Sequence, residues 1–111
     1  MKVDVHRMGS VSVISPRGAI AQDDVVTFAH HVEDQRVKSN GRMVLDLSQV
    51  AYIDSLGLNT LLDLCDRQRD AGQTMRVAAV QELCREILEL TQVSDGLDIF
   101  DTTENAVRSF L

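Results

Sequence analysis

The chain has 111 residues, of which 44% are hydrophobic and 25% are charged. This composition predicts a single folded domain over residues 1–111 and excludes an intrinsically disordered chain. The net charge of −6 argues against a direct nucleic-acid partner, because phosphate binding requires a clustered cationic face. No apolar run reaches the roughly 18 residues of a membrane span, and a signal-peptide core is absent, so we expect a cytoplasmic protein without membrane insertion.

The first part of the chain predicts a hairpin followed by a helix. Apolar alternation at residues 3–5 and 11–14, broken by a turn at 8–10, is typical of two antiparallel strands. Apolar residues then recur at helical spacing over about 23–38, and Ser39-Asn40-Gly41 closes this helix.

The rest of the chain alternates strands and helices. The expected elements are a doubly covered strand at 43–47, a helix at 55–71, a strand at 75–80, a helix at about 84–91, a strand at 97–100 and a last helix begun by a capping box at 101–104. The order β-β-α-β-α-β-α-β-α predicts an α/β fold with a mostly parallel central sheet of about five strands and about four helices.

Several residues are expected to be structural only. The buried stripe of the 55–71 helix is predicted to consist of Leu58, Leu61, Leu62 and Cys65. Thr91 is expected to line the apolar face of the next helix. Cys65 and Cys84 form no CxxC pair and are interpreted as reduced core residues. His30 and His31 are adjacent, and adjacent helical residues do not share a face. We therefore expect neither a metal nor a cofactor, and no catalytic triad or phosphate loop indicates an enzyme.

The seam between the 43–47 strand and the 55–71 helix carries a polar cluster, Asp54-Ser55-Leu56-Gly57. We expect Ser55 at the N-cap, where a hydroxyl typically stabilises by about 1 kcal/mol, and capping alone is one complete explanation of this serine. Leu56 falls outside the buried stripe, and Gly57 adds no side chain, so the two are expected to form an exposed docking patch.

The same cluster suits reversible phosphorylation. A phosphoryl group on Ser55 would add about −1.5 to −2 charges at a helix N-terminus, where the dipole and free amides favour an anion. A partner packed dry against Leu56 and Gly57 would have to bury that charge beside Asp54. Modification would then release the partner and leave the fold intact.

The segment "MVLDLSQVAYIDSLGLNTLLDLCDRQRDAG" resembles the STAS domain family, and the resemblance extends from the strand ending in Gly18 to the "REILELTQV" helix. It implies an anti-sigma factor antagonist, a non-enzymatic protein of transcription regulation. In this family the serine matching Ser55 is phosphorylated by a partner that is both an anti-sigma factor and a serine kinase of the histidine-kinase-like ATPase fold. The unphosphorylated form captures this partner and frees the sigma factor, and a PP2C-type phosphatase resets the cycle.

The resemblance also implies site residues. Asp54 matches the acidic residue that positions the acceptor serine, although a helix-flanking carboxylate with no further task remains an alternative. The implied partner-binding residues are Asp23, Asp54, Ser55, Leu56, Gly57, Asn59, Thr60 and Asp63. One position departs from the family: Ala21 stands where members often carry an aspartate, with Asp23 and Asp24 nearby.

Two other functions remain open. The chain is alternatively a non-switching STAS subunit of an ABC lipid-transport complex or a stress-signalling scaffold, in which Ser55 only caps its helix. A nucleotide-hydrolysing enzyme is the least supported reading. The acidic residues Asp63, Asp66 and Asp70 predict either a solvated helix face or a rim that contacts a basic partner. The sequence leaves the oligomeric state open.

Overall fold

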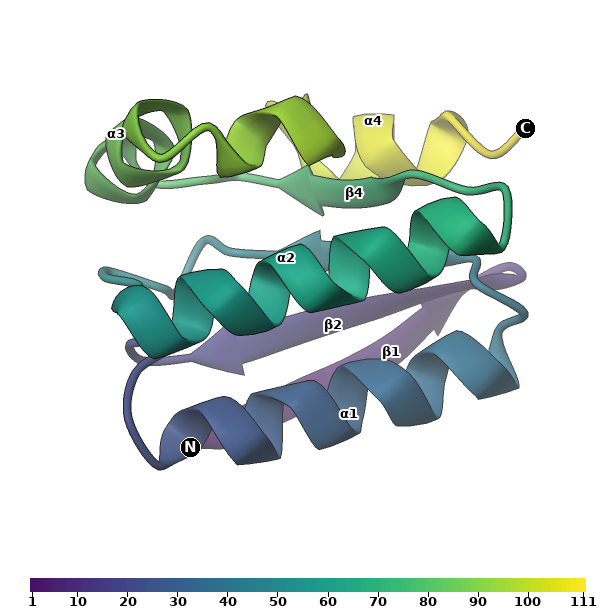
Figure 1. Ribbon diagram of the computed structural model, residues 1–111. Coiled ribbons are helices and arrows are strands. Elements are labelled where there is room, and N and C mark those ends of the chain that lie inside the picture. Colours follow the sequence, from purple (N-terminus) through teal and green to yellow (C-terminus); the bar gives the residue numbers. More distant parts are fainter.

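The computed structural model describes residues 1–111 as a five-stranded sheet with helices on both faces (Figure 1). The strands, in spatial order, are β1 (Lys2–Met8), β2 (Val11–Arg17), β3 (Met43–Asp46), β4 (Met75–Ala78) and β5 (Leu97–Phe100). The helices are α1 (Asp24–Lys38), α2 (Ser55–Asp70), α3 (Glu82–Leu90) and α4 (Thr103–Arg108), with a short 3₁₀ helix η1 (Val93–Gly96) before β5. The predicted α/β order of elements is confirmed.

The pairing of the strands matches the predicted hairpin and parallel sheet. β1 and β2 are antiparallel, with Val5 opposite Ile14, and Gly9 in the turn between them has a φ of 64°. β2, β3, β4 and β5 run parallel to their neighbours. Because the three pairs are parallel, the carboxyl ends of these four strands meet at one edge of the sheet.

The two faces of the sheet are covered unequally. Helices α1, α2 and α3 bury a large, mostly aliphatic cluster against one face, and α1 contributes Val25, Phe28 and Val32 to it, which follow the predicted helical spacing. The opposite face carries a small cluster in which Ala106 of α4 packs against Val44. Figure 1 shows α1 and α2 lying side by side across the strands, and the two helices are in contact. The prediction that β3 is covered on both faces is therefore confirmed.

The buried stripe of α2 differs from the prediction. Leu61 and Cys65 are buried as expected, but Leu58 is only half-buried and Leu62 is 41% exposed. Leu64 and Gly57 take the buried positions instead. The stripe therefore begins at Gly57 rather than Leu58, because a residue without a side chain lets the first turn of α2 approach the neighbouring chain.

Two other local expectations are wrong. Thr91 is exposed at the end of α3 and donates its hydroxyl proton to the carbonyl of Ile87, so it terminates the helix rather than lining it. The N-cap of α4 is Thr102, whose hydroxyl accepts from the amide of Asn105, rather than Asp101. Asp101 and Thr102 are adjacent and both are common N-cap residues, so the backbone conformation determines which of the two caps α4.

Both cysteines are free and buried, on α2 and α3. Burial raises the pKa of Cys65 to about 11 and also raises the pKa of Cys84. A thiol held in its protonated form is a poor nucleophile and a poor metal ligand, which fits a structural role. No cluster of three or more His, Cys, Asp or Glu residues is arranged to hold a metal ion. None of the helices combines the length and the apolar character needed to cross a membrane.

Candidate functional site at the start of α2

Asp54 joins the start of α2 to the segment that precedes α1. Its backbone is extended, and its Oδ1 accepts a hydrogen bond from the amide of Gly57 at 2.8 Å. Its Oδ2 accepts from the amide of Gln22 at 2.9 Å. The prediction that Ser55 is the N-cap is therefore wrong by one position. Asp54 is the N-cap, because its carboxylate accepts from the third amide of the helix, and Ser55 is the first helical residue.

The backbone of the same two segments is paired directly. Ile20 and Ile53 form a parallel β-bridge, in which the amide of Ile20 donates to the carbonyl of Tyr52 and the amide of Asp54 donates to the carbonyl of Ile20. Together with the Asp54 carboxylate, these contacts make the two segments one continuous surface.

Gly57 lies at the closest point of this junction. A Cβ atom built on Gly57 would stand 2.3 Å from the carbonyl oxygen of Ile20 and 2.9 Å from Cγ2 of Ile53. Gly57 is buried. The expectation that it offers bare backbone to a partner is wrong, since its missing side chain makes room for the protein's own chain instead.

The hydroxyl group of Ser55 makes no hydrogen bond within the fold. Ser55 is exposed, its hydroxyl enters none of the side-chain hydrogen bonds, and capping is carried out by Asp54. The first backbone hydrogen bond of α2 is donated by the amide of Leu58 to the carbonyl of Asp54. The amides of Ser55 and Leu56 therefore have no acceptor within the helix. An oxygen at this position is reachable from solvent and lies where the helix dipole favours negative charge.

The remaining predicted site residues are distributed along the outer side of α2. Leu56 is 55% exposed beside Ser55. Asn59 and Asp63 are exposed as expected, whereas Thr60 is half-buried. A partner that lies along this side of α2 would therefore contact Leu56 and Asn59 more readily than Thr60.

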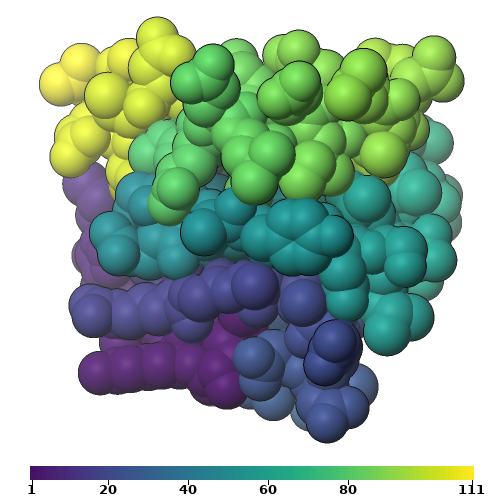
Figure 2. Space-filling view, turned by 90° about the vertical axis from the view of Figure 1, so that its left-hand side faces the viewer, coloured from purple at the N-terminus to yellow at the C-terminus, as the bar shows by residue number.

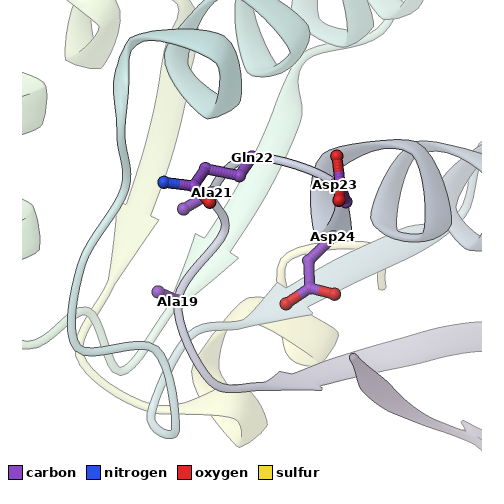
Figure 3. A pocket seen from close by; sticks show the side chains of 5 residues that line it. All are labelled: Ala19, Ala21, Gln22, Asp23 and Asp24. Carbon is purple, nitrogen blue, oxygen red and sulfur yellow. The ribbon is translucent and has the colours of Figure 1, made fainter.

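The segment before α1 contains a shallow hollow next to this junction. Figure 3 shows the residues that line it, which are Ala19, Ala21, Gln22, Asp23 and Asp24. The carboxylates of Asp23 and Asp24 point in opposite directions in this view. Asp23 is exposed and makes no capping bond, whereas Asp24 accepts from the terminal ammonium of Met1 at 3.0 Å. Ala21 is half-buried and brings no carboxylate to this hollow.

Gln22 belongs to this junction, although no pattern in the sequence predicts it. Its φ of 50° lies in the left-handed region, which is uncommon for a residue with a side chain. The hydrogen bond from its amide to Asp54 holds it in this conformation. Only the folded structure brings residues 22 and 54 together, and no local pattern marks a glutamine for such a turn.

The chain matches known proteins over nearly its whole length. A family model described as STAS domain matches residues 2–106. A candidate anti-sigma factor antagonist from Thermotoga maritima superposes with a TM-score of 0.87 and 21% sequence identity, covering 96% of this chain and 92% of that chain.

Two further solved structures have the same fold. The Bacillus cell fate determinant SpoIIAA in its phosphorylated form matches with a TM-score of 0.73 and 11% identity, covering 99% of this chain and 100% of that chain. The murine Solute Carrier 26 family member A9, an anion transporter, matches with a TM-score of 0.77 and 14% identity, covering 92% of this chain but only 18% of the transporter. At these identities the likenesses establish the fold.

Proposed function

Because the chain belongs to the STAS domain family, we propose that it is an anti-sigma factor antagonist that is switched by phosphorylation of Ser55. In this proposal the unphosphorylated protein binds an anti-sigma factor that is also a serine kinase of the histidine-kinase-like ATPase fold. Binding releases the sigma factor, phosphorylation of Ser55 releases the kinase, and a PP2C-type phosphatase restores the first state. The chain acts in the cytoplasm and has no enzymatic activity of its own.

One observation carries this proposal: the hydroxyl of Ser55 is exposed at the first helical position of α2 and is not used by the fold. A serine kept only for capping would donate or accept a bond at the helix end, and here Asp54 occupies that role. A phosphoryl group on Ser55 would meet the favourable end of the helix dipole, which typically stabilises an anion by about 0.3–1 kcal/mol. The fold therefore tolerates a modification that a protein packed on Leu56 would not.

The experiment is incubation with the anti-sigma factor kinase of the same organism and ATP, followed by intact-mass measurement. We expect the wild type to gain one phosphoryl group and the variant Ser55→Ala to gain none. Ser10→Ala is the matched control, because Ser10 is also exposed but lies in the β1–β2 turn at the opposite edge of the sheet. Equal phosphorylation of wild type and Ser55→Ala would contradict the proposal, as would steady ATP hydrolysis by the purified chain alone.

A second candidate function is a non-switching subunit of a transport complex or signalling scaffold. The likeness to a domain of the murine anion transporter favours it, and so does Ala21, which replaces the family's aspartate near the acceptor. In that case the chain would co-purify with a transport ATPase subunit or with the other proteins of the scaffold, and assembly would be indifferent to Ser55→Asp. Loss of the complex on Ser55→Asp supports the switch instead.

A further inference from the structure

Three segments form one surface at the carboxyl edge of the sheet. The first two segments are residues 18–24 and 47–56, which form the junction described above. The third is the start of α3, which is hydrogen-bonded to the loop between β3 and α2. Nε2 of Gln81 donates to the carbonyl of Ser48 at 2.8 Å, and Sγ of Cys84 lies 3.3 Å from the carbonyl oxygen of Val50. Figure 2 looks onto this edge and shows the three segments as adjoining bands, dark blue, teal and green.

Each of the last two segments presents a large apolar side chain to solvent. Tyr52 is 48% exposed and Leu56 is 55% exposed, and on the first turn of α3 Leu83 is 52% exposed. Single exposed apolar residues are ordinary, but three on segments that are joined by hydrogen bonds supply apolar side chains of the kind that protein contacts use.

The same segments contain no lysine or arginine. Residues 18–24, 47–56 and 79–83 together hold four acidic residues, Asp23, Asp24, Asp54 and Glu82. Of the cations that border these segments along the chain, Arg17 is paired with Asp4 at 2.7 Å, and Arg85 is half-buried in α3. Asp24 is paired with the terminal ammonium of Met1, and Asp54 accepts from two backbone amides, so Asp23 and Glu82 are the carboxylates left without a partner. The face therefore combines exposed apolar side chains with a net negative charge. Its electrostatic complement is a surface with lysine or arginine around an apolar recess.

We infer that this whole edge, including the start of α3, docks a protein whose contact surface is an apolar recess ringed by lysine and arginine. The inference rests on the proposed function, since the occupant is the anti-sigma factor kinase. It adds Leu83 and Glu82 to the contact surface, which extends the site from the start of α2 across the loop to a second helix.

The charge of this face also fixes how phosphorylation releases the partner. A dianion on Ser55 makes an acidic face more acidic, so it does not weaken the long-range attraction of a cationic partner. It acts only after contact, because a phosphoryl group beside Leu56 cannot be buried in a dry interface without losing its hydration. Phosphorylation therefore raises the dissociation rate constant and leaves the association rate constant nearly unchanged.

The test measures association and dissociation of the kinase on wild type, Leu83→Ala and Leu90→Ala. Leu90 is the matched control, since it is 79% exposed on the same helix but at its far end. We expect Leu83→Ala to weaken binding by about 10-fold or more, mostly through faster dissociation, and Leu90→Ala to change it by less than about 2-fold. Association with wild type should slow by about 10-fold or more between 0.05 and 0.5 M salt.

The phosphorylated protein supplies the second measurement. Its dissociation should be faster by about 10-fold or more, with an association rate constant within about 3-fold of the unmodified protein. Equal effects of Leu83→Ala and Leu90→Ala, or association that salt does not slow, overturn the inference while Ser55 phosphorylation and the proposed function stand. A kinase that neither binds nor phosphorylates the chain overturns both.

Discussion

The two ends of α2 are fixed by different kinds of contact. At the first turn the partners are backbone groups: the Ile20 carbonyl lies against Gly57, and the Asp54 carboxylate accepts from two amides. At the last turns the contacts are made by long side chains of α2 itself: Nη1 of Arg67 lies 3.1 Å from Oε1 of Glu33 in α1, and Nε2 of Gln68 donates to the backbone carbonyl of Gly41.

This difference leaves side chains at the start of α2 available for the proposed partner. Where backbone amides and one carboxylate hold a helix, its other side chains remain available, and here Ser55 and Leu56 face solvent. At the other end Arg67 is paired with Glu33 and Gln68 is buried, so these side chains are engaged within the fold. A site that must accept a phosphoryl group without unfolding is therefore better built at the first kind of helix end than at the second.

The largest effect is expected from Gly57→Ala. The added Cβ would meet the backbone oxygen of Ile20, which cannot move without breaking its bond from Asp54, so the first turn of α2 must shift. We expect the free energy of unfolding to fall by about 2–3 kcal/mol, the upper part of the usual range for overpacking, measured by urea denaturation.

Gly96→Ala is the control for that substitution. A Cβ on Gly96 would meet no atom closer than 3.5 Å, and its φ is not in the left-handed region. We expect a change below about 1 kcal/mol. A loss for Gly57→Ala no larger than that for Gly96→Ala would show that the start of α2 is not held by the close contact with Ile20.

The next largest effect is expected from Asp54. Asp54→Ala removes the acceptor of both amides and should lower the free energy of unfolding by about 1–2 kcal/mol. Asp54→Asn keeps one acceptor oxygen and should lose about half of that. Hydrogen exchange of the Gln22 and Gly57 amides gives the site-specific measurement, and protection of both amides in Asp54→Ala would contradict the double role of this carboxylate.

The sequence predicts the framework better than it predicts this junction. Periodicity and turn residues are local signals, and they located the strands, the helices and the exposed Ser55–Leu56 pair. The contact between Gly57 and Ile20 joins residues that are distant along the chain. The local sequence therefore does not distinguish a glycine that packs inward from one that is exposed to solvent. The buried stripe was displaced for the same reason, with Leu64 in place of Leu62, because the position of Gly57 sets the rotation of α2.

A smaller effect is expected at the other end of α2, from the ion pairs of Glu33. Its hydrogen bond from Arg36, with a further one from Arg67, lowers the pKa of Glu33 below its ordinary value of 4.5. The resulting stabilisation is complete above the unfolded-state pKa and is lost as the pH falls through the folded-state value. Glu33→Gln should therefore cost about 0.2–1 kcal/mol at pH 7 and progressively less below about pH 4.5.

Asp34→Asn is the matched control for the pair between the helices. Asp34 forms an exposed pair with Lys38 within α1 alone, at 2.9 Å. We expect it to cost no more than about 0.5 kcal/mol. If Glu33→Gln and Asp34→Asn lose the same stability and respond equally to salt, the pairing of Glu33 with Arg67 contributes nothing to holding the end of α2.

The smallest effect is expected from Gln68→Met, which tests whether the buried amide holds the end of α2. Gln68 is 1% exposed, its Oε1 has no hydrogen-bond partner, and its Nε2 donates to the Gly41 carbonyl at a long 3.3 Å. That carbonyl also accepts from the amide of Met43 at 3.0 Å, so it keeps a partner when Gln68 is replaced. Methionine has a similar volume and leaves no buried polar atom without a partner, so we expect the free energy of unfolding to change by less than about 1 kcal/mol. A loss of 2–3 kcal/mol, as for Gly57→Ala, would mean that both ends of α2 are held by equally critical contacts and would remove the contrast between them.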